Sequence, residues 1–315
     1  MPNRLILSFL LPLALWGAPE WVLIRTVDGT QVEGQCAVAS LKLPHGAHIL
    51  SVHNASPASD FETGRITAGL AALQAADRKA SDQAVAELTA IGLPVLTPLL
   101  KTLKDTDQHE PRPLYRLFER LIPSSADGLD RSLSLVRLPS GEGVRCRLPE
   151  GTVEVRTPDG GKASLPWSKI RTLAVRQKMV KRSTPVHSLR HCTQIEYLDT
   201  GVVLTAASKL DVTTQGFVRL SWDVDGWATD ADGLKKPGSP AYKTNLVDGH
   251  PFGALVGRIG PDGEVFFLGK KASKSGLPAG RLGLAVNDNR HWQNNLGSYT
   301  VTLSASEAYD LGDAQ

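Results

Sequence analysis

The pattern of hydrophobic and polar positions divides the chain into hairpin-rich and helical stretches. Residues 20–56 and 133–176 alternate apolar with polar positions, and Asp-Gly or Ser-Gly pairs interrupt the alternation. Alternation about such a pair indicates a β-hairpin, because these residues accept the backbone conformation of a tight turn. The two stretches share the order strand, turn, strand, which indicates either an internal duplication or two unrelated hairpin-rich segments. Both are predicted to be β-modules.

The stretch between them, 59–122, has a different pattern. Alanine and leucine recur there at helical spacing, and Ala84, Leu88 and Ile91 fall on one helix face. A Gly-Leu-Pro break separates this face from the next apolar one. Over 80–122 the pattern weakly resembles a HEAT-repeat helix pair, but such repeats need about three stacked units for stability. We therefore predict a helical insert that packs on the flanking β-units.

The C-terminal third returns to short apolar runs. Runs at 252–259, 264–268 and 281–286 are separated by Pro-Asp-Gly and by a loop of lysine, serine and glycine. Residues 299–303 then alternate apolar with polar positions. The lengths of these runs and the residues that separate them predict strands.

Composition and charge limit the classes of protein to which this chain could belong, but they do not indicate a particular function. The chain has 315 residues, of which 41% are apolar and 21% charged, which is typical of a globular protein of two or three domains. Its net charge of +3 is too small to predict a nucleic-acid partner. Cys36, Cys146 and Cys192 are far apart and lack the spacing of a zinc site, so one disulfide with a free thiol and three reduced thiols both stay open.

The N-terminus predicts export. Residues 1–18 combine a positive charge, an apolar run that ends at Trp16, and small residues after it, which is the architecture of a signal peptide. The apolar run is too short to span a bilayer in the usual way, and no other stretch approaches 18 apolar residues. We expect a secreted or periplasmic protein with no membrane span in its mature form.

Candidate chemistry gathers in the loop between the apolar run at 281–286 and the alternating stretch at 299–303. Asp288, Asn294 and Asn295 bring one carboxylate and two amides close together in sequence. Ca²⁺ takes six to eight oxygen ligands of this kind, whereas a plain turn is the alternative use of the same residues. The segment from Asp230 to Gly233 begins like an EF-hand loop, but the glutamate that closes such a loop is absent. The sequence has no GxSxG, HExxH or phosphate-loop motif, so we predict no enzyme activity.

Four phrases in this part resemble the PA-IL family of calcium-dependent galactose-binding bacterial lectins. In chain order they are Gly226-Trp227-Ala228, FGALVGRIG from Phe252, Asn287-Asp288, and NNLGSYTV from Asn294. The resemblance spans about 198–304, a third of the chain. It implies a small antiparallel β-sandwich of the galactose-binding-domain-like kind. It also implies one Ca²⁺ at the loop end of the sandwich, where sugar hydroxyls complete the coordination of the ion.

The resemblance carries over calcium ligands but not the residues that select galactose. The implied ligands, three side chains and two backbone carbonyls, are Asp288, Asn294, Asn295, Asp230 and either His291 or Trp292. The family's aromatic residue after the GWA phrase is Asp230 here, which would add a carboxylate near the ion. Its sugar-reading His-Pro-Asp-Gln turn is replaced by Lys-Pro-Gly-Ser-Pro-Ala-Tyr at 236–242. The side chains predicted to contact a sugar are Asp288, Asn294, Trp292 and Tyr242.

We therefore predict a mainly β chain with a small helical insert and a C-terminal antiparallel β-sandwich. Its predicted function is non-enzymatic capture of sugar hydroxyls through a loop-bound calcium ion, with carbohydrate as the partner. The alternative is an envelope or protein–protein interaction module that keeps the lectin fold, has lost sugar binding and takes envelope proteins as partners. The predicted parts are a signal peptide at 1–18, β-modules at 19–57 and 127–178, a HEAT-like segment at 58–126, a linker at 179–197, the lectin-like sandwich at 198–305 and a tail at 306–315.

Overall fold

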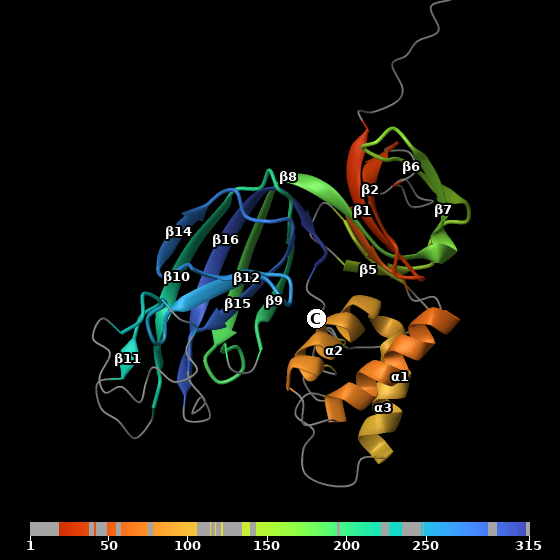
Figure 1. Cartoon of the computed structure of the whole chain (residues 1–315). Helices are drawn as coiled ribbons and strands as arrows, with labels where there is room; N and C mark the ends of the chain where they lie inside the picture. The colour runs from red at the N-terminus through yellow and green to blue at the C-terminus, as the bar shows by residue number, and fades with distance from the viewer. Residues whose placement is uncertain are drawn as a thin grey trace, which may run out of the picture.

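The structure is a computed structural model, and it has three parts. Figure 1 shows an N-terminal β-domain, a group of helices next to it and a larger C-terminal β-sandwich, with strand β8 running from one β-part into the other. The predicted fold class is confirmed, since the chain is mainly β with a small helical insert and a C-terminal antiparallel sandwich. The described residues are 19–37, 41, 49–54, 58–74, 78–105, 114, 117, 121, 134–138, 143–193, 196–221, 227–234, 247, 249–288 and 295–312.

The N-terminal β-domain joins strands from both sides of the helical insert. Its strands are β1 (Glu20–Thr26), β2 (Gln31–Cys36), β3 (Ser51–His53), β4 (Ser134–Arg137), β5 (Gly143–Cys146), β6 (Thr152–Arg156), β7 (Lys162–Pro166) and the first half of β8 (Ile170–His187). β1 and β3 both pair with β8, β3 pairs with β4, and β2 pairs with β6. The two predicted β-modules are therefore one domain. Their apolar faces close on a single core that includes Ile24, Val52, Val136, Val155 and Leu173.

The Asp28-Gly29 pair forms the turn that the sequence predicts between β1 and β2. Gly29 has a φ of 85°, in the left-handed region that glycine adopts without strain. The carboxylate of Asp28 accepts a hydrogen bond from the backbone N–H of Thr30 at 3.0 Å. The turn is thus closed by its own side chain, as is common for aspartate in turns.

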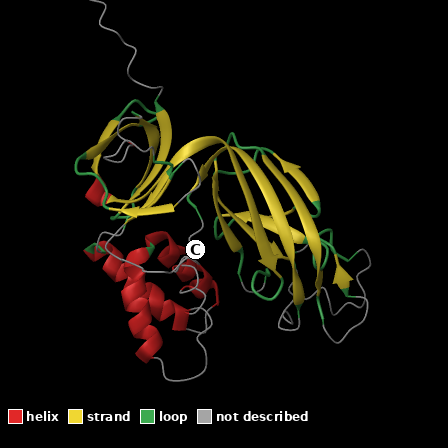
Figure 2. Ribbon diagram, turned by 180° about the vertical axis from the view of Figure 1, so that it is seen from behind, coloured by secondary structure: helices red, strands yellow, loops and turns green. Residues whose placement is uncertain are grey.

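The helical insert consists of α1 (Asp60–Gln74), α2 (Arg78–Ile91), a 3₁₀ turn η2 (Leu93–Val95) and α3 (Leu96–Asp105). Figure 2 shows these helices grouped against one end of the N-terminal β-domain. Leu88 and Ile91 lie on the buried face of α2 as predicted, and they pack with Leu70 and Leu99 of the other helices. No helix in the described part of the chain has both the length and the apolar character needed to cross a membrane.

A buried ion pair joins the insert to the β-domain. Both carboxylate oxygens of Glu62, in the first turn of α1, accept hydrogen bonds from Arg171 of β8, at 2.7 and 2.6 Å. The two side chains are 4% and 1% exposed. Ser59 completes a capping box with Glu62, because each backbone N–H donates to the other side chain, at 3.0 and 3.2 Å. The insert therefore packs on the β-domain through a specific polar contact.

The C-terminal sandwich has two layers of antiparallel strands. One layer contains β13 (Val265–Phe267), β12 (Leu255–Ile259), β15 (Gly280–Val286) and β9 (Leu198–Leu204) in that order. The other contains the second half of β8, β16 (Leu296–Asp310) and β10 (Leu210–Arg219), and β10 also pairs with β11 (Ala228–Thr229) and β14 (Lys271–Lys274). Side chains from both layers share one core, which includes Val186, Leu210, Leu255, Leu284 and Val301.

Two predicted boundaries differ from the structure. β8 continues unbroken to His187, so the first half of the predicted linker at 179–197 is strand. Its exposed polar residues hide an alternation in which Val180 and Val186 are buried in the sandwich core. β16 likewise continues to Asp310, so the first half of the predicted tail at 306–315 pairs with β8 and β9.

The structure also distinguishes the two cysteine arrangements that the sequence leaves open. Cys36, Cys146 and Cys192 are all free thiols, and Cys36 and Cys192 are buried. Burial raises the pKa of Cys36 to about 12. That thiol is therefore protonated at neutral pH and behaves as a small apolar side chain of the core.

Candidate functional site

The predicted calcium ligands belong to one end of the sandwich, which we call the loop end. β15 ends at Val286 just before Asp288, and β16 begins at Leu296 just after Asn295. Arg219, the last residue of β10, pairs with the first residue of β16 on one side and with β11 on the other. The turn at Asp230 directly follows β11. The antiparallel pairing thus brings segments far apart in sequence to the same end of the fold (Figure 1).

Asp288 and Asn295 are in contact and are buried. Asp288 is 1% exposed and Asn295 is 2% exposed. The amide nitrogen of Asn295 donates to a carboxylate oxygen of Asp288 and to the backbone carbonyl of Ser188, the latter at 3.2 Å. The amide oxygen of Asn295 is buried and accepts no hydrogen bond in the described part of the chain. A buried acceptor left in this state costs about 1–3 kcal/mol, so this oxygen is suited to a cation supplied from solution.

Asn287, the residue before Asp288, holds a neighbouring segment against the loop end. It is fully buried. Its amide nitrogen donates to the carbonyls of His250 and Pro251, at 3.0 and 3.2 Å, and its amide oxygen accepts from the N–H of Val247 at 3.1 Å. The sequence interpretation included Asn287 in a family phrase but assigned it no role. The sequence signal that could have identified this positioning role is an asparagine directly before a predicted ligand, Asp288.

Thr193 orients the backbone of Asp288. Its hydroxyl lies 3.1 Å from both the backbone nitrogen and the backbone carbonyl oxygen of Asp288. The neighbouring Cys192 forms a parallel bridge with Val286 at the end of β15. Thr193 falls in the segment predicted to be a linker, so the sequence offered no reason to connect it with the site.

Asp230 contributes to the loop end through its backbone rather than its carboxylate. Its carbonyl oxygen lies 2.9 Å from the hydroxyl of Tyr299, which also lies 2.7 Å from the carbonyl oxygen of Gly253. Burial raises the pKa of Tyr299 well above its usual range, so the phenol stays a neutral donor. The carboxylate of Asp230 instead forms an ion pair with Lys270 at 2.9 Å. The place of this carboxylate near an ion therefore stays a prediction, and Lys270 is its ion-pair partner in the structure.

The remaining predicted site residues lie outside the described residues. They are Asn294, Trp292 and its alternative His291, and Tyr242. Within the part of the chain that the structure describes, no three His, Cys, Asp or Glu side chains gather in a way that could hold a metal ion. The two side chains that do meet, Asp288 and Asn295, carry a carboxylate and an amide oxygen, which are the hard oxygen ligands that suit Ca²⁺ rather than zinc.

Comparisons with known proteins add a structural likeness. No protein-family model matches the sequence, and no match was found among curated proteins. Among solved structures, the chain is similar to one described as "EclA N-terminal domain; PllA-like lectin". The sequence identity is 21% and the TM-score 0.32, and the match covers 41% of this chain and 98% of that chain. A likeness at this TM-score does not identify the protein, and the chemistry of the loop end has to come from its own residues.

Proposed function

We propose that the protein binds carbohydrate at the loop end of its C-terminal sandwich, with a Ca²⁺ ion held by Asp288 and Asn295. The observation that carries the proposal is the state of the buried Asn295 side chain, whose amide nitrogen donates to the carboxylate of Asp288 while its amide oxygen accepts no hydrogen bond within the described chain. The order of the phrases that resemble the PA-IL lectins supports the same two residues. Sequence and burial thus favour one chemistry from independent directions.

The residues around the ligands have roles that do not depend on the sugar. Thr193 and Asn287 fix the backbone and the neighbours of Asp288 through hydrogen bonds of 3.0–3.4 Å. Tyr299 holds the carbonyl of Asp230 at the same end. The resemblance implies Asn294 and the carbonyls near Asp230 and His291 or Trp292 as further ligands. When bound, Ca²⁺ supplies open coordination positions that adjacent sugar hydroxyls can fill.

We expect weak sugar binding without a preference for galactose. Selection between epimers requires hydrogen-bond partners placed for one particular hydroxyl, and a site built in that way rejects analogues that lack it. The turn that supplies such partners in the resembled family reads Lys-Pro-Gly-Ser-Pro-Ala-Tyr here, at 236–242. Tyr242 and Trp292 are the side chains that we expect to contact the sugar, through a hydroxyl and an apolar ring face.

Calorimetric titration of the full chain with galactose, mannose and fucose tests this function. Each sugar is titrated once with millimolar Ca²⁺ and once in EDTA. We expect weak heats in calcium for at least one sugar with adjacent hydroxyls, and no binding in EDTA. Binding that persists in EDTA, or no binding of any glycan on a wider array, would overturn the proposal. Tight binding of galactose alone would show that the selecting residues lie elsewhere.

A second candidate function, a protein–protein interaction module, is favoured by exposed apolar side chains near the loop end. Phe217 of β10 is 66% exposed and Leu296 of β16 is 53% exposed. Phe217 pairs with Ser298, two residues from Leu296, so both side chains point from the same outer face of the sheet. Neighbouring exposed apolar groups of this size often mark an interaction surface. If this candidate holds, Phe217→Ser will weaken chemical cross-linking to envelope proteins while sugar titrations stay silent in calcium.

We also propose that the protein acts outside the cytoplasm. The predicted signal peptide at 1–18 supports this location, and calcium modules outside the cell typically bind the ion with Kd values of about 10⁻⁴–10⁻³ M. N-terminal sequencing of native material is expected to give a start near Pro19. Recovery of Met1 from that material would contradict export with cleavage.

A further inference from the structure

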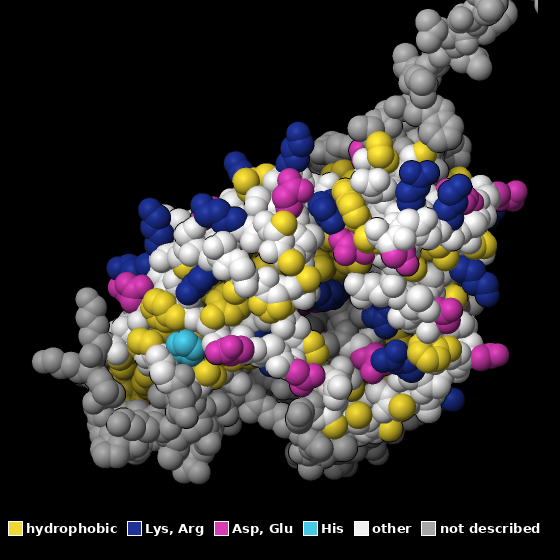
Figure 3. Space-filling view, turned by 45° about the horizontal axis from the view of Figure 1, so that its top comes forward, with side chains coloured by type: hydrophobic (Ala, Val, Ile, Leu, Met, Phe, Trp, Pro, Cys, Tyr) yellow, Lys and Arg dark blue, Asp and Glu magenta, His cyan; other side chains and the backbone are white. Residues whose placement is uncertain are grey.

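A cleft of about 410 Å³ lies where the three parts of the molecule meet. Its walls come from β1 and β2, from α1 and α2, and from the β9, β12 and β15 side of the sandwich. Figure 3 shows the surface hollowed between the sandwich and the other parts, with basic and acidic side chains around the hollow. Arg281 lines this cleft near the start of β15, whereas Asp288 follows the end of that strand. The cleft is therefore separate from the loop end.

Four arginines and three acidic residues line this cleft, the acidic ones being Glu87, Glu196 and Asp199. Three of the arginines contact a carboxylate or an aromatic ring of the chain. These contacts are Arg65 with Glu87, Arg281 with Asp199 at 2.7 Å, and Arg258 over the ring of Tyr197 at 3.9 Å. The fourth, Arg25, has neither an ion pair nor a hydrogen bond from its guanidinium in the described part of the chain.

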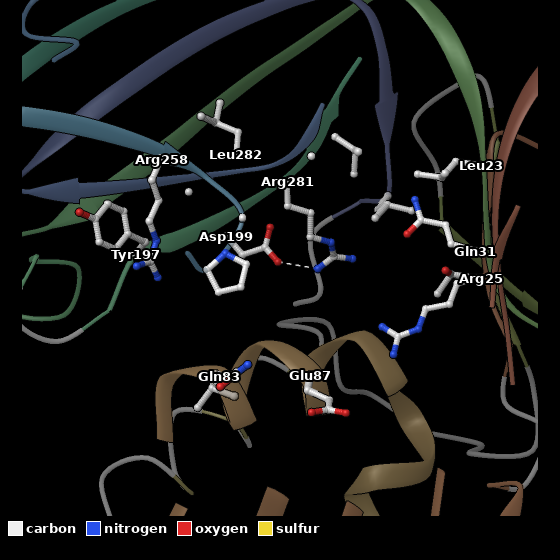
Figure 4. A pocket seen from close by; sticks show the side chains of 18 of the residues that line it. Leu23, Arg25, Gln31, Gln83, Glu87, Tyr197, Asp199, Arg258, Arg281 and Leu282 are labelled. Carbon is white, nitrogen blue, oxygen red and sulfur yellow. Dashed lines mark hydrogen bonds and ion pairs between the residues drawn. The ribbon is translucent and has the colours of Figure 1, made fainter. Parts of the chain in front are cut away.

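Arg25 is placed where its positive charge is poorly compensated. It lies on β1 between the buried residues Ile24 and Thr26, and it points into the cleft across from Arg281 (Figure 4). Burial lowers the pKa of Arg25 and the charges of Arg65 and Arg281 lower it further, whereas the charge of Glu62 raises it only in part. A guanidinium remains charged at neutral pH even so, because its ordinary pKa is above 12. An anion in the cleft would relieve this unfavourable arrangement.

The rest of the lining indicates what kind of molecule would carry the anion. Gln31 and Gln83 offer amide donors and acceptors from opposite walls, as Figure 4 shows. Leu23, Leu282 and Leu311 supply apolar surface. The volume lies at the lower end of the range for small-molecule sites, which fits a ligand of about monosaccharide size. A guanidinium fork binds carboxylate, sulfate or phosphate through two parallel hydrogen bonds.

We propose that this cleft is a second binding site, for a compact ligand that bears an oxyanion, with Arg25 as the cation that binds it. The polar lining fits a hydroxylated carrier such as an acidic monosaccharide. This site does not use calcium. The proposal for this cleft can therefore be tested independently of the function proposed for the loop end.

Titration of the full chain in EDTA tests the proposal, since EDTA removes calcium and so prevents calcium-dependent binding at the loop end. The probes are glucuronate, glucose 6-sulfate and glucose 6-phosphate. Glucose, which has the same sugar ring without the anionic group, is the neutral comparison. We expect saturable binding of at least one anionic probe and none of glucose, and the preferred probe identifies the oxyanion. Equal binding of glucose and the anions, or no saturable binding of any anionic probe, would overturn the proposal.

Variants of Arg25 make the test specific. Arg25→Met is expected to raise the Kd of the bound probe about tenfold or more, because charge-assisted hydrogen bonds are lost. Arg25→Lys keeps the charge without the planar fork and is expected to weaken binding less. Arg156→Met, on the exposed face of β6 and outside the cleft, is the matched control and should bind as wild type does.

A stability measurement separates this role from a structural one. Without ligand, Arg25→Met should unfold at a temperature no lower than wild type, because it removes a charge that burial and neighbouring arginines disfavour. With the bound probe, wild type and Arg156→Met should gain thermal stability while Arg25→Met should not. Unchanged probe affinity in both Arg25 variants would contradict the assignment of Arg25.

Discussion

Two buried carboxylates of this protein have different kinds of hydrogen-bond partner. Glu62, at the start of α1, has both oxygens bound by the guanidinium of Arg171, and the residues of this pair come from the insert and the β-domain. Asp288, at the loop end, accepts from the amide nitrogen of Asn295, and the amide oxygen of that same asparagine accepts nothing within the described chain. The carboxylate of Glu62 is thus neutralised by a cation of the chain itself, which makes it a closed pair. The Asp288–Asn295 contact is an open cluster, because its buried amide oxygen has no donor among the described residues.

This difference in hydrogen-bond partners indicates a different role for each of the two carboxylates. A closed pair is a structural contact, since breaking it leaves a charge buried without its partner. A buried acceptor with no donor lowers stability unless something from outside the chain binds it. The Glu62–Arg171 pair therefore explains how the insert is held, and the Asp288–Asn295 contact explains why a ligand site is expected at the loop end.

Breaking the closed pair should have the largest effect on stability. Glu62→Ala leaves Arg171 buried and unpaired, which should lower the free energy of unfolding by about 3–5 kcal/mol. Urea denaturation of the full chain measures the change. The double variant Glu62→Leu with Arg171→Met should recover most of the loss, because the two apolar side chains replace the whole pair. A loss below about 1 kcal/mol in Glu62→Ala would show that the pair does not hold the insert.

Changing the open cluster should give an effect that calcium reverses. Asn295→Asp places a second carboxylate beside Asp288, and repulsion between them should cost about 2 kcal/mol or more in EDTA. Millimolar Ca²⁺ should restore the loss, because the ion is attracted to both charges. Thermal unfolding in EDTA and in calcium measures the difference. Equal destabilisation in both buffers would indicate that no ion binds between these residues.

Tyr299 tests whether the packing beneath the loop end supports the site. Tyr299→Phe removes a hydroxyl that lies within 2.9 Å of the carbonyls of Asp230 and Gly253, at an expected cost of about 1–2 kcal/mol. Calcium affinity should fall as well if the Asp230 carbonyl is a ligand. Tyr309→Phe, whose hydroxyl donates to Glu33 at 2.7 Å, is the matched control that should leave calcium affinity unchanged. Parallel calcium titrations of both variants decide whether the effect is local.

The smallest expected effect is at the helix cap beside the closed pair. Ser59→Ala removes the side-chain oxygen that accepts the N–H of Glu62 at 3.2 Å, which should cost about 1 kcal/mol. The variant should keep full calcium and sugar binding, since the cap lies in a different part of the molecule. A larger loss than in Glu62→Ala, measured by the same urea denaturation, would reverse the order of the two contacts.

Local periodicity predicted the elements better than their assembly. The helical spacing of Ala84, Leu88 and Ile91 and the Asp28-Gly29 turn depend on neighbouring residues, and both appear as predicted. The pairing of β3 with β8 joins residues far apart in sequence, so no local pattern indicated that the two β-modules are one domain. The linker prediction at 179–197 failed because polar residues on the exposed side of β8 conceal its strand alternation.

The sequence identified only those candidate site residues that lie within the phrases of the resemblance. Asp288 and Asn295 were identified from such phrases and lie in contact. Thr193 and Tyr299 were missed because they act on backbone atoms of distant residues, which leaves no mark in the sequence around the site. The Arg25 cleft was missed for a related reason, since it exists only where three parts of the fold meet.

Calcium binding at the loop end is tested most directly by thermal unfolding of the full chain across a calcium titration. The matched pair is Asp288→Asn at the site and Asp211→Asn, whose half-exposed side chain lies near the other end of β10. We expect wild type and Asp211→Asn to gain about 2.7 kcal/mol at a hundredfold excess of Ca²⁺ over Kd, and Asp288→Asn to gain almost nothing. An unfolding curve of wild type that is the same in EDTA and in millimolar calcium would contradict the account.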